Sequence, residues 1–314
     1  MEGRSSTKPV AHIYQRTING FLLFYSVSDF LVFFSIICTV AKKRRITLLG
    51  VCPMFDHIHV LAEAFSRKEI SGFVWEYTLD YAKAFNTSIG GKGSIFEDCF
   101  GCSIKRKEKA IRTTCSYLYN NPVEKKLCGK APGYRWNFLA YADQRYPFSK
   151  PIVRNKASSR IRKAAAAVDW CVQMNKPLNY TLLSSITDPL DKAERQQLTD
   201  YIIYSYSSID YGRLISFYGS YEKMCLAFES NQGSEYDIKE EYDPDNHLAY
   251  IRLGAAVAKM APDGDIKKIL SAPLEKRLSI MRAVRWECKA TERQLEKYFR
   301  IPPQGVEAIS LTIN

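Results

Sequence analysis

Residues 46–64 read ITLLGVCPMFDHIHVLAEA, and this stretch decides the fold of the N-terminal half. Residues 46–54 and 57–64 are rich in Val, Ile and Leu, a composition typical of buried β-strands. The break between the two runs is Phe55-Asp56. The stretch therefore predicts two consecutive strands, with His57 and His59 on the second one.

The segments on either side add a further strand and three helices. Residues 11–18 alternate like a strand, and residues 29–40 have the apolar character of a core helix with Asp29 as its N-cap. Residues 70–85 carry aromatic side chains at helical spacing, and a basic helix is expected from about residue 105 to residue 120. This β-α-β-β-α order predicts an α+β fold, with helices on one face of an antiparallel sheet.

The apolar run at residues 21–41 suggests a membrane segment at first, because four basic residues follow it. Ser26, Ser28 and Asp29 interrupt the run, and the uninterrupted residues 30–41 are shorter than the roughly 20 apolar residues that span a bilayer. We therefore predict a buried core helix and no membrane partner. A membrane-anchored basic protein is the less favoured alternative.

Length and charge suggest how the chain is divided. A chain of 314 residues, 46% hydrophobic and 25% charged, has the composition of a globular protein with roughly two domains. Residues 1–150 carry a net charge of +10 out of the total of +12, whereas residues 151–314 are close to neutral at +2. We expect a basic domain at residues 1–150 that binds a polyanion, either nucleic acid or a membrane surface, and a second domain at residues 151–314.

The cysteines indicate a reducing compartment. The chain has nine, an odd number scattered without a cleavable signal, so we expect free thiols and a cytoplasmic location. Cys99, Cys102, Cys115 and Cys128 allow a four-thiolate zinc site as an alternative. This alternative is not favoured, because Cys115 lies within a predicted helix, two residues before Tyr117.

His57 and His59 are the first of two chemical motifs. Side chains at positions i and i+2 of a strand point to the same face, so the two imidazoles can converge on one divalent metal ion. The alternative is a pair of strand histidines without a ligand.

The second motif is residues 117–123, YLYNNPV. On a helix, Tyr117 and Asn121 are about 40° apart, so the phenol and the carboxamide share one face, whereas Tyr119 lies about 200° from Tyr117 and is expected to pack. A tyrosine hydroxyl can attack phosphorus, and an asparagine oxygen can complete a metal shell. Pro122 is expected to end or kink the helix. A core tyrosine is the alternative for Tyr117.

Taken together, these ordered motifs resemble the HUH single-tyrosine transposases, in particular the REP-associated tyrosine transposases. The resemblance rests on His57-Ile58-His59 and on residues 117–122, and it covers roughly residues 8 to 145. Supporting landmarks are residues 13–16, 22–24, 91–93 and 134–137, with Asp29, Phe96 and Phe100. Where the family usually has Met-Pro-Asn, this chain has Met54-Phe55-Asp56, and Asp56 is expected to tune the metal site or to cap the turn.

The resemblance implies a ferredoxin-like antiparallel sheet, the HUH nuclease fold, and a metal-dependent tyrosine transposase. His57, His59 and Asn121 would bind Mg²⁺ or Mn²⁺, and Tyr117 would form a 5′-phosphotyrosine link during cleavage and rejoining of single-stranded or hairpin DNA. Backbone phosphates would be met by two basic runs, Lys42, Lys43, Arg44 and Arg45 with Lys105, Arg106, Lys107, Lys109 and Arg112. Such a protein would act at the nucleoid, and a homodimer is left open. The alternative is a non-catalytic nucleic-acid-binding regulator with the same fold.

The second half is predicted to be mostly α-helical, after a linker at residues 147–156. Helices are expected at residues 158–174 and 191–206. Residues 291–299 followed by Ile301-Pro302-Pro303 suggest the first helix and turn of a helix-turn-helix, with residues 304–311 as its recognition helix, although ordinary helical hairpins share this pattern. The acidic residues 235–245 are expected to form a solvated loop or to shield the DNA groove.

Overall fold

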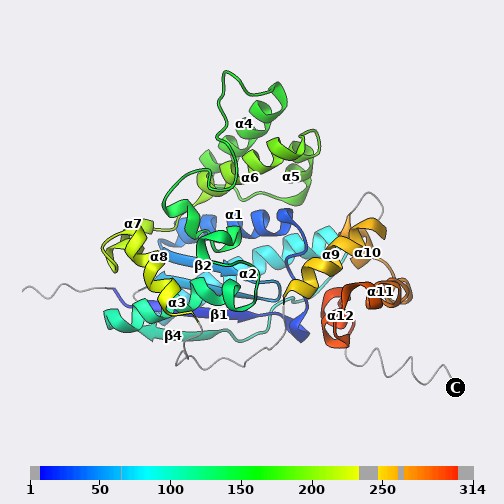
Figure 1. Cartoon of the computed structure of the whole chain (residues 1–314), viewed down its shortest axis with the longest axis horizontal. Helices are drawn as coiled ribbons and strands as arrows, with labels where there is room; N and C mark the ends of the chain where they lie inside the picture. Colours follow the sequence, from blue (N-terminus) through cyan, green and yellow to red (C-terminus); the bar gives the residue numbers. More distant parts are fainter. Residues whose placement is uncertain (1–7, 65, 233–246, 261–264, 303–314) are drawn as a thin grey trace, which may run out of the picture.

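Four antiparallel strands form the centre of the protein in a computed structural model, which describes residues 8–64, 66–232, 247–260 and 265–302. The strands lie in the order β2-β3-β1-β4 (Figure 1). Their bounds are Val10–Arg16 for β1, Thr47–Pro53 for β2, His57–Glu63 for β3 and Gly101–Lys105 for β4. With helices between β1 and β2 and between β3 and β4, this order is the ferredoxin-like arrangement that we expected.

The register of the central strands separates an apolar face of the sheet from a polar one. Tyr14 of β1 pairs with His59 of β3, and Arg16 pairs with His57. Because neighbouring residues of a strand point to opposite faces, these side chains share one face with His12. Apolar residues that alternate with them belong to the larger core, namely Ala11, Ile13, Ile58, Val60 and Ala62.

Helices cover both faces of the sheet, so the prediction that they cover one face is wrong. Helices α1 (Val27–Arg44) and α2 (Arg67–Ile89) pack with each other and share the larger core with the apolar face. Helix α3 (Glu108–Glu124) contacts β2, β3 and β4, and its apolar side chains belong to a second core with Leu49 and Leu61. Helix α3 packs there because the face of the sheet that carries the histidines also carries apolar side chains, which α3 buries. Tyr117 is thereby brought against the histidine face.

Helix α1 is a core helix, as predicted, and most of its residues are buried. Its N-cap is Ser26 and not Asp29, which stands three residues later and accepts a hydrogen bond from the Ser26 backbone N–H at 2.8 Å. The two residues form a capping box, in which the acidic member lies in the first turn. Among the described residues, no helix is long and apolar enough to cross a membrane.

The predicted basic helix begins later than expected, because its first residue, Lys105, belongs to a strand and Lys107 is the N-cap. Lys105 pairs with Val10 in β4, which covers the otherwise open edge of β1, and α3 starts at Glu108. We expected Pro122 to end or kink the helix; the helix continues past Pro122 to Glu124, so Pro122 does not end it, and a kink at this position stays a prediction. A proline this close to the C-terminal end removes only one backbone hydrogen bond from the helix.

The rest of the described chain is mostly helical, as expected. Figure 1 shows α4 to α6 beyond α1, α7 and α8 beside α3 at the left, and α9 to α12 towards the right-hand end of the sheet. The helices are α4 (Ser159–Gln173), α5 (Tyr180–Thr187), α6 (Lys192–Tyr206), α7 (Tyr211–Ser216), α8 (Tyr221–Ser230), α9 (Leu248–Met260), α10 (Ile266–Leu270), α11 (Leu274–Cys288) and α12 (Glu292–Phe299). Short 3₁₀ helices are η1 (Ile18–Gly20), η2 (Ala131–Gly133), η3 (Arg135–Asn137) and η4 (Leu139–Ala142).

Two expectations for this half fall wholly or partly on residues that are not described. Helix α12 forms where the first helix of a helix-turn-helix was predicted, but the expected recognition helix at residues 304–311 lies outside the described residues. The acidic residues 235–245 lie outside them as well. The domain boundary near residue 150 stays a prediction.

Candidate active site

All four histidines of the chain gather at one place, although the sequence pattern pointed to only two of them. His12 comes from β1, His57 and His59 come from β3, and His247 directly precedes α9. The ring centroids are 5.4 Å apart for His12 and His59, 5.0 Å for His57 and His59, and 6.2 Å for His57 and His247. This cluster lies on the polar face of the sheet, beneath α3.

The hydrogen bonds of His59 define which of its ring nitrogens can act as a ligand. Asn121 Nδ2 donates to His59 Nε2 over 3.2 Å, so Nε2 carries a lone pair and the ring proton lies on Nδ1. His59 Nδ1 then donates to His12 Nε2, also over 3.2 Å. His12 therefore holds the ring of His59 in place and fixes its tautomer.

A carboxylate does the same for His57. His57 Nδ1 lies 2.7 Å from Asp56 Oδ1, so Nδ1 donates to the carboxylate and Nε2 is the ring nitrogen that is left for a ligand. Asp56 Oδ2 is 3.5 Å from Lys297 Nζ of α12. Asp56 thus lies between His57 and a lysine that is 241 residues away in the sequence. Of the two roles expected for Asp56, this contact favours the tuning of a metal site.

Burial governs the charge of these groups. Burial, together with the nearby charge of Lys105, lowers the pKa of His12 to about 4. Burial and the neighbouring His57 and His12 hold the pKa of His59 well below its ordinary value. Burial by itself would raise the pKa of Asp56, but its hydrogen bond with His57 and the charges of His57, His247 and Lys297 keep that pKa far below the usual range. At neutral pH the site therefore contains neutral His12 and His59 beside an ionised Asp56.

Tyr117 is the tyrosine of α3 that faces the histidines. Its half-buried ring lies 5.5 Å from the ring of His59 and 5.9 Å from that of His12, measured between centroids. Tyr119 points the other way, as predicted: it is fully buried, and its hydroxyl donates to the Leu49 carbonyl at 3.1 Å. The two tyrosines of one helix therefore occupy different environments.

The donor atoms at this place fit a divalent cation. The Nε2 atoms of His57 and His59 are the ring nitrogens that Asp56 and His12 do not bind, and a bound ion would replace Asn121 Nδ2 at His59 Nε2. Asn121 also has a buried Oδ1 with no hydrogen-bond partner among the described residues. An amide oxygen and imidazole nitrogens are suitable ligands for several divalent ions. Among the described residues, no group of three or more His, Cys, Asp or Glu side chains is arranged to hold a metal ion. An ion here would therefore need Asn121 in addition to the two histidines.

The structure separates the two predicted basic runs. Lys42, Lys43, Arg44 and Arg45 lie at the C-terminal end of α1, just before the edge strand β2, whereas Lys105 ends the opposite edge strand β4. Lys43 and Arg44 form ion pairs with Glu76 of α2, so their charges are partly used within the protein.

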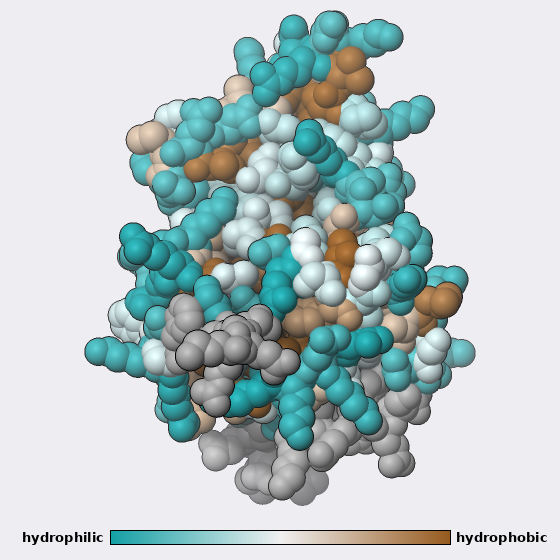
Figure 2. Space-filling model, turned by 90° about the vertical axis from the view of Figure 1, so that its left-hand side faces the viewer, coloured by the Kyte–Doolittle hydropathy of each residue, from teal (hydrophilic) through white to brown (hydrophobic). Residues whose placement is uncertain are grey.

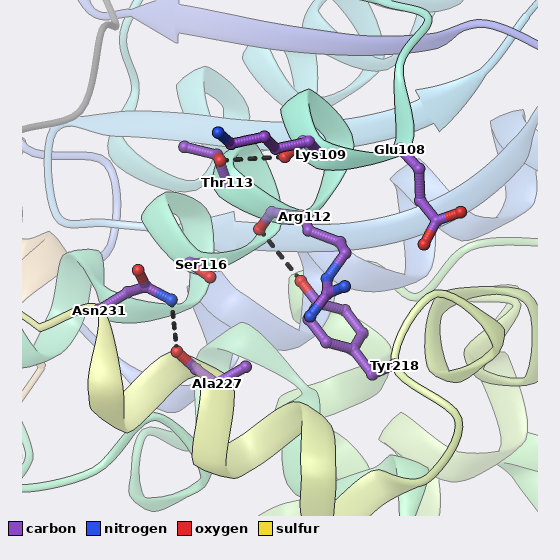
Figure 3. Close-up of a pocket in the computed structure, with 8 residues that line it drawn as sticks. All are labelled: Glu108, Lys109, Arg112, Thr113, Ser116, Tyr218, Ala227 and Asn231. Carbon is purple, nitrogen blue, oxygen red and sulfur yellow. Dashed lines mark hydrogen bonds between the residues drawn. The ribbon is translucent and has the colours of Figure 1, made fainter.

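The second run leads into the helix of Tyr117. Arg106, Lys107 and Lys109 are exposed, and Lys109 and Arg112 line a cavity of about 370 Å³ beside α3 (Figure 3). The Arg112 guanidinium lies over the ring of Tyr218 at 5.0 Å, and Tyr218 donates a hydrogen bond to the Arg112 carbonyl at 3.0 Å. Figure 2 shows that the side of the molecule on which α7 lies is mostly hydrophilic, with limited hydrophobic patches. The basic side chains of α3 therefore lie on the helix that carries Tyr117, beside a cavity that Tyr218 and α8 also line.

The four cysteines of the alternative zinc site have different surroundings. Cys99 and Cys102 are exposed around the start of β4, while Cys115 is buried in the second core. Cys128 is half-buried at the edge of that core.

Sequence reasoning missed His12, Tyr14, His247 and Lys297 as parts of the site. The alternation in residues 11–18 could have indicated His12 and Tyr14, because they share a strand face as His57 and His59 do. No local pattern points to His247 or Lys297, which reach the site through the packing of α9 and α12.

Comparison with known proteins confirms the resemblance that these motifs suggested. Residues 25–121 match the family model described as "Transposase IS200 like". The matched segment contains His57, His59 and Tyr117 and ends at Asn121, so it includes the complete proposed ligand set. This part of the chain is therefore similar to the IS200-like transposases, and the match supports a DNA transposase-type function.

Solved structures are also similar to this chain, and one of them is a transposase with DNA. It is described as the REP-associated tyrosine transposase bound to a REP hairpin, and it is 16% identical over 43% of this chain and 79% of that chain. The TM-score is 0.35. No curated protein matches the chain.

Proposed function

We propose that this protein is a DNA transposase or endonuclease that cleaves and rejoins single-stranded or hairpin DNA through a 5′-phosphotyrosine intermediate. The observation that carries the proposal is that the ring of Tyr117 lies beside His59, which in turn contacts His57 and the Asn121 amide. These groups come from β3 and α3, and the family match spans all of them. A protein that only binds nucleic acid would have no need of this arrangement.

Tyr117 is the proposed nucleophile. Its hydroxyl oxygen would bond to phosphorus while the bond between phosphorus and the DNA 3′ oxygen breaks, and the phenol proton is lost as the departing 3′ oxygen gains one. The product is a 5′-phosphotyrosine and a free 3′-hydroxyl. A different 3′-hydroxyl can then attack the phosphotyrosine and restore Tyr117, which joins strands without ATP because the covalent link conserves the phosphodiester energy.

His57, His59 and Asn121 are proposed to hold Mg²⁺ or Mn²⁺ at this site. The bound ion would supply Lewis-acid polarisation of a non-bridging phosphate oxygen. His12 and Asp56 orient the two imidazoles through the hydrogen bonds described above.

The proposed substrate approaches along the basic residues at the start of α3. Lys105, Arg106, Lys107, Lys109 and Arg112 would neutralise backbone phosphates, while nearby aromatic side chains could stack bases. The solved structure named above was obtained with a REP hairpin, which makes a DNA hairpin the first substrate to test.

The decisive test compares two tyrosines of the same helix. Full-length protein is incubated with labelled single-stranded hairpin DNA and Mn²⁺, and covalent protein–DNA adduct is measured on a denaturing gel. Tyr117→Phe should abolish the adduct and retain DNA binding, because only the nucleophilic oxygen is removed. Tyr119→Phe should still form the adduct, since its hydroxyl donates to Leu49 inside the protein. An adduct that persists in Tyr117→Phe would overturn the assignment of the nucleophile.

A further inference from the structure

We propose that Lys297, on α12, is a positioning residue that acts through Asp56 to hold the imidazole of His57 in its ligand-presenting orientation. The inference rests on the proposed function, because it concerns a histidine of the proposed metal site. It assigns to the C-terminal half of the chain a direct part in building that site.

The contact that carries this inference is a buried ion pair. Lys297 Nζ lies 3.5 Å from Asp56 Oδ2, and the two side chains are only 6% and 7% exposed. The other oxygen of the same carboxylate accepts the hydrogen bond from His57 Nδ1 at 2.7 Å. Asp56 is therefore held at both oxygens, by an ammonium on one side and by an imidazole on the other.

The backbone around Lys297 is fixed by the segment that precedes α1. Leu22 N–H donates to the Lys297 carbonyl at 3.3 Å, and the Tyr25 hydroxyl donates to the Tyr298 carbonyl at 2.9 Å. Gly20, which has a positive φ of 66°, allows the lysine stem to pass: a Cβ added there would lie 3.0 Å from Lys297 Cε. The stem is thus guided along one path to Asp56.

A buried ammonium is costly unless a partner compensates for lost hydration, so its position calls for an explanation. Packing alone would be served better by an apolar side chain of the same volume. A carboxylate that orients a metal-binding histidine is a recurrent arrangement in metal sites, and its loss weakens metal binding by about 10- to 100-fold. Here Lys297 adds a third residue to this arrangement: the lysine holds Asp56, and Asp56 orients His57.

A second buried lysine provides a matched control. Lys267 Nζ lies 2.9 Å from Asp29 Oδ1, and these side chains are 11% and 0% exposed, so this pair resembles the pair of Lys297 and Asp56. Asp29 lies in the first turn of α1, where it accepts a hydrogen bond from the Ser26 backbone N–H. Lys297→Met and Lys267→Met therefore remove equivalent charges, of which only one adjoins the candidate site.

The first measurement needs neither metal nor DNA. In metal-free full-length protein, the Nδ1–H signal of His57 is followed by ¹⁵N NMR, which is practicable because the chain has only four histidines. We expect Lys297→Met to broaden or abolish this signal, because Asp56 loses the partner that holds its carboxylate. Lys267→Met should leave the signal as it is in the unmodified protein.

The second measurement is calorimetric titration with Mn²⁺ alone. Lys297→Met should weaken the affinity by about 10-fold or more, whereas Lys267→Met should not change it. Lys297→Gln, a polar neutral variant, provides the same test if the methionine variant does not fold. If the Lys297 and Lys267 variants give the same His57 signal and the same Mn²⁺ affinity, the inference is wrong. Failure of the proposed function has a different signature, namely unmodified protein that binds Mn²⁺ but forms no adduct with DNA.

Discussion

The histidines of this protein are set apart from ordinary surface histidines by burial. His59 is fully buried, and both of its ring nitrogens have partners in the protein, Asn121 on one side and His12 on the other. A neutral imidazole with a defined tautomer is the form that can bind a metal ion. The contact with His12 thus contributes to the chemistry of His59 although His12 is not a proposed ligand.

Burial of His12 predicts a loss of stability in acid. Because the pKa of His12 falls from the ordinary 6.5 to about 4, the unfolded chain binds more protons than the folded protein between these values. The free energy of unfolding should therefore fall as the pH is lowered from 6.5 towards 4, by about 3 kcal/mol for His12 alone. The pKa of His59 is also lowered in the folded protein, so His59 adds to this loss of stability in acid.

Urea unfolding of metal-free protein at several pH values between 7 and 4.5 measures this effect. His12→Gln retains a side chain that can accept a hydrogen bond from His59 but cannot titrate, so its stability should depend less on pH. Equal pH dependence of the variant and the unmodified protein would contradict the prediction.

Helix α3 acts as a two-sided element. One side presents Tyr117 and Asn121 to the histidines, and the other packs Leu118 and Tyr119 into the second core. Helix α8 supports this packing, since the ring of Phe228 stacks on Tyr119 with centroids 5.3 Å apart and the Phe228 carbonyl accepts from Asn120 Nδ2 at 2.8 Å. The position of Tyr117 therefore depends on a helix more than a hundred residues further along the chain.

Removing this support should destabilise the protein. Phe228→Ala deletes a ring that is 1% exposed, and such a truncation costs about 3–5 kcal/mol, because the protein loses apolar burial and is left with a cavity. Leu226→Ala on the same helix is the control: Leu226 is 65% exposed, so its change should stay within about 0.5 kcal/mol. Chemical denaturation of both variants gives the comparison, and equal stabilities would show that α8 does not support α3 in this way.

Over the whole molecule, the two halves of the sequence are not independent in their packing. The core that contains Ala11 and Ile13 of β1 also contains Ile202 of α6, Leu253 of α9 and Phe299 of α12. A division near residue 150, which we continue to propose, would therefore separate two parts with a large shared interface. The location of Lys297 beside Asp56 is one consequence of this interface.

The charge distribution predicts salt-dependent DNA binding with unequal contributions from the two basic runs. The slope of log affinity against log salt is negative, and it should become less steep by about 2 in the triple variant Arg106→Ala, Lys107→Ala, Lys109→Ala. This corresponds to about 0.7 for each phosphate contact with a single strand. Lys43→Ala with Arg44→Ala should change it less per residue, because Glu76 already engages both charges. Fluorescence anisotropy with hairpin DNA at several salt concentrations tests this. An affinity independent of ionic strength would count against phosphate contacts.

Local patterns were sufficient for much of this protein. The strands at residues 46–64, the shared face of His57 and His59, and the shared face of Tyr117 and Asn121 follow from spacings of two and four residues, because strand and helix periodicity act over a few residues. Strand β4 was not located by its own pattern, since its pairing depends on the edge of β1 and not on its own composition. The covering of the histidine face by α3 was also missed, because it depends on how α3 packs against the sheet and not on the composition of α3 alone.

What only the tertiary structure decided is the completion of the site. His12 reaches His59, His247 reaches His57, and Lys297 reaches Asp56, each from a distant segment. These side chains meet because the apolar faces of β1, α9 and α12 must be buried in the common core. A spacing along the chain cannot encode such meetings, because they arise from the packing of whole elements. The sequence by itself therefore determined which residues carry the proposed chemistry, and the tertiary structure decided which residues hold them in place.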